Sequence, residues 1–239
     1  MKRILLMISA VLLSAIPMFG ITADEIIRKL EENRSGSIES VSSFIVNNNE
    51  KKMHAYQDAN GDMLVEFTNP EEKGRKILRL NNEIYLYYPK AEEVVHLQGE
   101  ALKDSVLGSD FSYEDLTGGK SILDKYDASL GENEVIDNND CYVITLSAKK
   151  KNVVYPKEVF WIDMKVFNYR KGEFYAKSGK LVKRMTVSAF MNVSGKTVPS
   201  YMEMSDVLKT GSKTVYKLVS MKTGIKIDDK IFQLEELSW

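Results

Sequence analysis

The sequence is poor in the residues that most often carry chemistry. It has one cysteine, Cys141, and two histidines, His54 and His96, among 239 residues. A single cysteine cannot form a disulfide within the chain, which excludes a small extracellular scaffold held together by disulfides. No H-x-x-H, H-E-x-x-H or C-x-x-C motif occurs, so the common zinc motifs are missing. We expect neither a metal nor a cofactor.

The catalytic inventory is equally thin. The sequence contains no G-x-S-x-G nucleophile elbow. Cys141 fits a small buried residue on a strand, with a Cys–His pair left open as the alternative. We therefore expect no enzyme and no catalytic residue. If the protein were an enzyme, its best site would be Asp110, Glu114, Asp115 and His96. Replacing the three acidic residues with their amides would test this alternative.

An excess of charge of one sign is also missing. The chain has 33 Lys and Arg against 34 Asp and Glu, a net charge of −1. Without residues 1–23 the balance is 31 to 34, a net charge of −3. No face is forced to be strongly basic, so nucleic acid is not an expected partner. The remaining chain is long enough to bury a core that needs no disulfide.

The long hydrophobic run is confined to the N-terminus. Lys2-Arg3 precedes an apolar stretch over 4–16, and Pro17, Gly20 and Ala23 follow it. This order is typical of a secretory signal, and the apolar stretch is too short to span a bilayer comfortably. We expect residues 1–23 to be a signal peptide, residues 24–239 to form one domain, and the mature protein to reach a bacterial periplasm.

The first segment after the leader has helical spacing. Thr22 and Glu25 form a Thr-x-x-Glu capping box, and Ile26, Ile27 and Leu30 make an apolar stripe. A short helix is therefore expected to open the mature chain and to end near residues 33–36.

Most of the later sequence alternates as strands do, and Asn81-Asn82 between two such runs is a hairpin signal. The expected strands are 63–68, 75–80, 83–88, 94–97, 141–147, 159–164, 168–175, 181–190, 198–207, 214–223 and 231–232. Regularly spaced strands with short turns predict an antiparallel sheet that curls toward a barrel or a sandwich.

Residues 108–116, GSDFSYEDL, interrupt this rhythm and hold Asp110, Glu114 and Asp115. The three acids could bind a hard cation, but their spacing does not match an EF-hand loop. Ser112 and Asp115 fit a capping box with Asp in the place of Glu, which predicts a short helix beginning at Ser112. We expect this segment to cover the mouth of the barrel, with hinges at Gly108 and Gly118-Gly119.

Methionine and aromatic residues are abundant in the expected strands, and methionine suits an apolar ligand of variable shape. Strand parity, with the inward face undetermined, selects the candidates for a lipid-binding wall, and the segment 108–116 adds three more. They are Met63, Val65, Phe67, Leu78, Leu80, Trp161, Met185, Val187, Met202 and Met204 from the strands, with Phe111, Tyr113 and Leu116 from the covering segment.

Four stretches resemble the outer-membrane lipoprotein-sorting proteins of the LolA-like superfamily, in particular a periplasmic branch often associated with RND-type exporters. They are residues 75–89, the string GSDFSYEDL, Val159-Phe160-Trp161-Ile162-Asp163, and 173–183. The resemblance spans roughly residues 45–235. It implies a mainly β (α+β) fold, an incomplete, curved antiparallel β-barrel with a few short helices forming a lid over an apolar cavity.

The resemblance also implies a function. It indicates a periplasmic carrier that shields the acyl chains of a lipid or lipoprotein on the way to the outer membrane, with an RND-type or ABC-type inner-membrane transporter as the candidate partner. Some members hold cargo with an arginine near the cavity mouth, and Arg75 and Arg79 lie in the matching region. A non-carrier sensor or adaptor that binds a protein partner on the same fold is the alternative. A monomer is expected.

Overall fold

The computed structural model of the chain describes residues 20–34, 36–118, 121–151 and 153–238. The predicted signal peptide falls mainly on residues 1–19 and so lies outside the described residues. Within the described ranges, no helix combines the length and the apolar character needed to cross a membrane.

The described chain is dominated by antiparallel strands. They are β1 (Ile38–Val46), β2 (Asn49–Gln57), β3 (Met63–Phe67), β4 (Lys76–Leu80), β5 (Glu83–Tyr88), β6 (Glu93–Leu97), β7 (Tyr126–Leu130), β8 (Glu134–Ile136), β9 (Asn139–Ala148), β10 (Lys157–Asp163), β11 (Tyr169–Tyr175), β12 (Leu181–Val193), β13 (Lys196–Asp206) and β14 (Thr214–Thr223). The helical segments are α1 (Ala23–Glu32), α2 (Tyr113–Thr117), α3 (Ile122–Lys125) and the 3-10 helices η1 (Gly99–Lys103), η2 (Val106–Gly108), η3 (Asp229–Phe232) and η4 (Glu235–Ser238).

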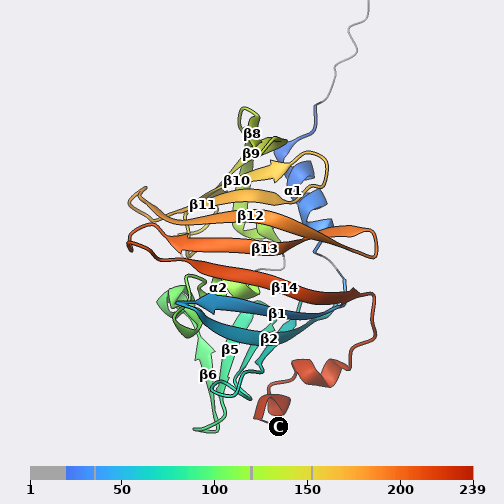
Figure 1. Cartoon of the computed structure of the whole chain (residues 1–239), viewed down its shortest axis with the longest axis vertical. Helices are drawn as coiled ribbons and strands as arrows, with labels where there is room; N and C mark the ends of the chain where they lie inside the picture. Colours follow the sequence, from blue (N-terminus) through green and yellow to red (C-terminus); the bar gives the residue numbers. More distant parts are fainter. Residues whose placement is uncertain (1–19, 35, 119–120, 152, 239) are drawn as a thin grey trace, which may run out of the picture.

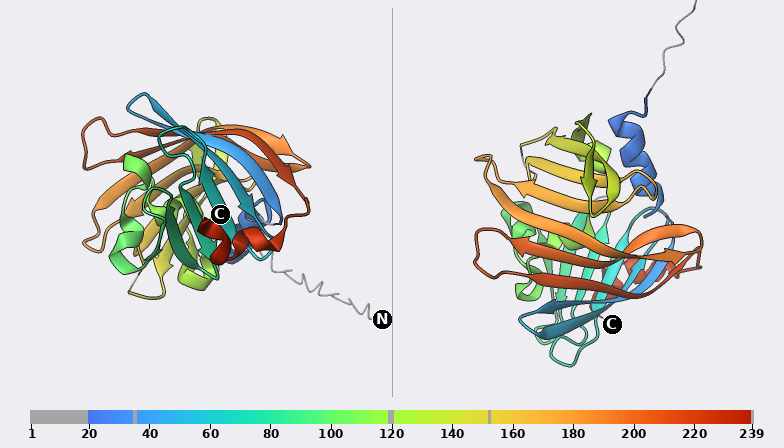
Figure 2. Two further views of the ribbon diagram at one scale, coloured as in Figure 1. Left: turned by 90° about the horizontal axis from the view of Figure 1, so that it is seen from below. Right: turned by 45° about the horizontal axis from the view of Figure 1, so that its top comes forward.

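The strands form one open sheet in the order β6-β5-β4-β3-β2-β1-β14-β13-β12-β11-β10-β9-β7, with β8 paired to β9. The sheet curves strongly, and its two edges do not meet (Figures 1 and 2). The expected fold class, an incomplete antiparallel barrel with a few short helices, is confirmed. Only the expected strand at 231–232 is wrong, because Ile231 and Phe232 belong to η3.

The local signals explain most of the boundaries. Asn81 and Asn82 have φ of 52° and 70°, the left-handed conformation that a tight two-residue hairpin requires. Thr22 caps α1 through the expected capping box, since its hydroxyl accepts from the Glu25 amide and the Glu25 carboxylate accepts from the Thr22 amide.

The pairing between β13 and β14 is short for strands of their length. The two strands pair from Tyr201↔Lys217 to Met204↔Thr214, whereas β14 pairs with β1 along its length and β13 pairs with β12 along its length. Beyond this short seam the two strands diverge (Figure 1). We call β7–β13 with α1 the first half, and β14 with β1–β6 the second half.

Each half has its own apolar core. Ile26, Ile27 and Leu30 of α1 pack in the first half with β9–β12. Phe44 and Met53 pack in the second half with β3–β5 and the helical segments η1, η2 and α2. Tyr216, next to the seam, contacts both clusters.

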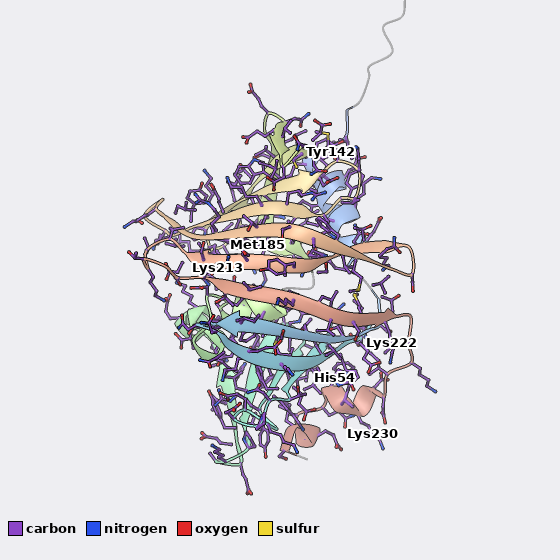
Figure 3. All side chains as sticks on the ribbon, viewed as in Figure 1. His54, Tyr142, Met185, Lys213, Lys222 and Lys230 are labelled. Carbon is purple, nitrogen blue, oxygen red and sulfur yellow. The ribbon has the colours of Figure 1, made fainter. Side chains whose placement is uncertain are left out.

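Around β1, β2, β13 and β14 the convex face of the sheet carries ion pairs. Lys222 and His54 both contact the Glu39 carboxylate, at 2.9 and 3.0 Å, and Lys213 pairs with Glu203 at 2.6 Å (Figure 3). Exposed ion pairs of this kind contribute little to stability but keep the face hydrated. An apolar ligand site is therefore to be sought on the concave face.

Candidate functional site

A cavity of about 380 Å³ lies on the concave side, between the two halves. Pockets that bind small molecules typically span about 300–1,000 Å³. Its wall comes from β1–β3 and β14 of the second half, from β10–β13 of the first half, and from the segments around α2 and α3.

Methionine is the most prominent residue of this wall. The lining methionines among the described residues are Met53, Met63, Met185, Met202, Met204 and Met221. Aromatic and aliphatic side chains complete it, among them Phe160, Phe174 and Tyr216. A wall of unbranched, polarizable side chains can adapt to apolar ligands of different shapes.

The structure brings seven of the predicted lipid-binding residues to the cavity wall. They are Met63, Val65, Phe111, Leu116, Met185, Met202 and Met204. Phe67, Tyr113 and Val187 are buried in the two cores beside the cavity and do not line it. Contact with a lipid stays a prediction for all of them.

The structure does not bring Leu78, Leu80 and Trp161 to the cavity. Leu78 and Leu80 lie on the opposite face of β4, where Phe232 and Leu237 of the C-terminal 3-10 helices pack. Trp161 lies on the outer face of β10 beside Cys141 and Val159. Strand parity alone could not separate the faces, because both faces of these strands are covered by apolar side chains.

The segment 106–118 lies on the concave side of the sheet (Figure 2). The predicted capping box of α2 is confirmed, since the Ser112 hydroxyl accepts from the Asp115 amide at 3.1 Å and the Asp115 carboxylate accepts from the Ser112 amide at 2.8 Å. Gly108 and Gly118 have φ of 77° and 63°, a conformation that favours glycine. Their role as hinges stays a prediction, and Gly119 lies outside the described residues.

Asp115 also anchors α2 to the first half. Its Oδ2 accepts from Lys183 Nζ of β12 at 2.7 Å and from the Tyr155 hydroxyl at 3.2 Å. The side chains of Asp115 and Lys183 are 7% and 15% exposed, so this ion pair is well buried. Burial, with the Asp115 charge beside it, raises the pKa of Tyr155.

Arg79 anchors α2 to the second half. Its guanidinium donates to the Thr117 carbonyl at the end of α2 and to the Gly61 carbonyl. Burial lowers its pKa to about 10, helped by the nearby charge of Arg34, so Arg79 is still charged at neutral pH. Its Nε has no hydrogen-bond partner among the described residues. Arg75 instead pairs with Glu72 at 3.2 Å, away from the cavity wall.

The acidic residues of 108–116 have protein partners rather than the arrangement of a cation site. Asp110 accepts from the hydroxyls of Ser212 and Thr214 at the start of β14, and Glu114 pairs with Lys125. No group of three or more potential metal ligands occurs in the part of the chain that the structure describes.

Among the described residues, no histidine hydrogen-bonds to Cys141, so the structure does not show the Cys–His pair that the sequence left open. Cys141 is buried beside Trp161 and donates weakly to the Asn139 carbonyl at 3.4 Å, and its pKa is raised by burial. His96 pairs with Glu83 at 2.6 Å and stacks on Tyr85, on β5 and β6.

Sequence reasoning missed several polar residues of the wall, among them Arg34, Gln57 and Glu158. Glu158 on β10 lines the cavity and accepts a hydrogen bond from the Tyr126 hydroxyl at 2.8 Å. Burial raises its pKa to about 8. A signal was available, because Glu158 shares strand parity with Phe160 and Ile162, and a carboxylate on an apolar strand face is unusual.

Gly172 is packed so closely against two cavity-lining side chains that it leaves no space for a Cβ atom. This residue lies opposite Phe160 and Met185 on the neighbouring strands, and a Cβ here would lie 2.8 Å from Phe160 Cε1 and 3.3 Å from Met185 Cε. We expect Gly172→Ala to lower the free energy of unfolding by about 1–3 kcal/mol, the usual cost of overpacking. Chemical denaturation measures this change.

Gly131→Ala is the matched control, since its Cβ would meet Val143 at an ordinary 3.4 Å. Equal losses of stability in the two variants would contradict the overpacking argument.

Comparisons with known proteins agree with this geometry. A family model described as "Uncharacterized protein" matches residues 59–239. No significant match to a curated protein was found.

Solved structures are similar over nearly their whole length. A LolA superfamily protein from Nitrosomonas europaea is 26% identical, with a TM-score of 0.76 over 90% of this chain and 99% of its own. A domain from Vibrio parahaemolyticus, named for the sorting of outer membrane lipoproteins, is 22% identical, with a TM-score of 0.80 over 91% and 100%. A DUF1329 family protein from Desulfovibrio piger is 23% identical, with a TM-score of 0.81 over 90% and 97%.

Proposed function

Because this chain belongs to the family matched over residues 59–239 and has the fold of the LolA superfamily, we propose that it is a carrier for the acyl chains of a lipid or lipoprotein. The predicted signal peptide puts its site of action in the periplasm. Transfer toward the outer membrane, with an RND-type or ABC-type transporter as donor, completes the proposal.

One observation carries the proposal: an apolar, methionine-rich cavity of about 380 Å³ on the concave face of the open barrel. An acyl chain left in water costs about 0.8 kcal/mol per CH₂ group. A cavity that removes those groups from water offsets this cost without chemistry. The proposal therefore assigns the protein a binding role and no catalytic group.

Mass spectrometry of the protein purified under native conditions from its own compartment tests the proposal. Stoichiometric lipid or acylated protein supports the carrier. A protein partner with an empty cavity favours the sensor or adaptor, which is the second candidate. Recovery of neither from native material would contradict both.

Filling the cavity gives a sharper test. Ala55 on β2 lines the cavity between Met53 and Gln57. We expect Ala55→Trp to remove most of the bound lipid, because the indole occupies the space that the acyl chain needs. The lipid-to-protein ratio after native purification measures the effect.

The matched control is Val219→Trp, at a position on β14 that is 62% exposed and off the cavity wall. It should bind lipid as the unmodified protein does. Phe67→Asp would be less informative, because Phe67 is fully buried and a carboxylate at this position would affect folding.

A further inference from the structure

The cavity is not uniformly apolar, because one part of its wall carries hydrogen-bonding side chains. Tyr126, Tyr155 and Glu158 line it together with Glu114 and Asp115 from α2. They lie where α2 and α3 approach the N-terminal end of β10. The lining methionines lie on β2, β3 and β12–β14, so the cavity has a polar part and an apolar part.

Glu158 is the central member of the polar part. Its Oε1 lies 2.8 Å from the Tyr126 hydroxyl, whose single hydrogen is shared between this oxygen and the Tyr155 carbonyl at 3.0 Å. The described residues give its Oε2 no hydrogen-bond partner and the carboxyl no ion pair. The side chain is half-buried, and since Glu158 lines the cavity, we take its open surface to face the cavity.

The charges that face Glu158 are already matched with one another. Asp115 pairs with Lys183, and Glu114 pairs with Lys125. A carboxylate at Glu158 would therefore lack a counter-charge of its own. Burial is the main cause that raises its pKa to about 8, and the charges of Asp115 and Glu114 add to it while Lys125 opposes it.

At neutral pH the Glu158 side chain is thus held mainly as a carboxylic acid. A protonated carboxyl group has one O–H to donate, while its other oxygen can accept from Tyr126. A buried donor without an acceptor is costly, so the group is selective for a ligand that brings an acceptor.

We propose that Glu158, oriented by Tyr126, forms a recognition site for the carbonyl oxygen that joins an acyl chain to its headgroup, with the chain lying against the methionine-lined part of the cavity. The inference rests on the carrier proposal and deepens it. The shared chemistry is a carbonyl acceptor, which an ester of a glycerolipid or the amide of an N-acylated protein can supply.

The experiment compares delipidated mature protein with Glu158→Leu, using dodecane, methyl undecanoate and N-methylundecanamide as probes in competition with a fluorescent alkane. The leucine variant should bind dodecane at least as well as the unmodified protein and the ester or amide roughly tenfold more weakly, which corresponds to about 1.4 kcal/mol. Ester and amide results distinguish a glycerolipid from an N-acylated protein.

Glu158→Gln keeps a donor at the same position, so it should retain the preference for a carbonyl. The unmodified protein should lose the preference as the pH rises through about 8, because ionised Glu158 has no proton to donate, while Glu158→Gln should show no such change. The leucine variant is expected to fold. Because the pKa of Glu158 is higher in the folded than in the unfolded state, this carboxyl lowers the stability of the protein as the pH rises above its unfolded-state pKa, and leucine removes that loss.

Three results would overturn the inference. Equal weakening of dodecane and ester binding in Glu158→Leu would mean a purely structural role. Tighter binding of dodecyltrimethylammonium than of the ester would mean a cation site. Failure of the unmodified protein to bind any probe, dodecane included, would instead overturn the carrier proposal and this inference with it.

Discussion

Asp115→Ala will lower the free energy of unfolding by about 3 kcal/mol or more, because it leaves the buried ammonium of Lys183 without its counter-charge. The same change removes the acceptor of the Ser112 amide, which is the side-chain half of the capping box contributed by Asp115. It also releases the Tyr155 hydroxyl. Since these bonds hold α2 to the first half, bound lipid should exchange faster as well.

Urea denaturation of two further variants separates the ion pair from the cap. Asp115→Ala combined with Lys183→Met should recover most of the ion-pair loss, because neither charge is then left unpaired. Glu114→Gln, at a more exposed pair with Lys125, should cost less than about 1 kcal/mol. Equal destabilisation by Asp115→Ala and Glu114→Gln would show that Asp115 does not anchor α2.

Under the carrier proposal, Arg79→Met is expected to accelerate the release of lipid by roughly tenfold or more. Arg79 holds the end of α2 through the Thr117 carbonyl and the preceding loop through the Gly61 carbonyl. Hydrogen bonds from a charged group contribute about 1.5–3 kcal/mol each, and about 1.4 kcal/mol corresponds to a tenfold change. The unpartnered Nε of Arg79 offsets part of the loss, so the change stays below the sum of two bonds.

Transfer of a fluorescent lipid from the protein to phosphatidylcholine vesicles, followed by stopped flow, measures this rate. Arg75→Met is the matched control, because Arg75 contacts Glu72 and the Tyr88 ring and does not line the cavity. If both variants release lipid at the rate of the unmodified protein, Arg79 is not a retaining residue.

The features that the sequence predicted well are those encoded over a few residues. The capping boxes at Thr22 and Ser112 each join two residues that are three positions apart, and both are present. The Asn81-Asn82 hairpin is similar, since asparagine tolerates the left-handed backbone that the turn needs. Strand alternation and spacing predicted an antiparallel sheet that curls toward a barrel or a sandwich, and the family resemblance implied the incomplete barrel with short helices.

The strands that were not individually predicted lack a clear apolar alternation. β1 and β2 are rich in serine, lysine and glutamate, because one face meets solvent and part of the other face lines the cavity. The error at Ile231 and Phe232 has a different cause. Two apolar residues fit a short strand or a 3-10 turn equally well, and burial of Phe232 against Leu78 decides the outcome.

The site was less predictable than the fold for a physical reason. Which face of a strand is concave depends on the curvature of the whole sheet, which no short segment encodes. Leu78 and Trp161 lie on faces that other elements of the protein cover, so their hydrophobicity resembles that of Met63 or Met185. Arg79 was selected together with Arg75, and only the tertiary contacts distinguish them.

The short pairing between β13 and β14 has a mechanical consequence. Each half has its own apolar core, with Tyr216 contacting both, and the halves are joined by a ladder of only four residue pairs. We therefore expect the angle between the two halves to be easily changed, and the cavity lies between the halves. A change in this angle would alter the cavity volume, so under the carrier proposal one cavity could accept ligands of different size.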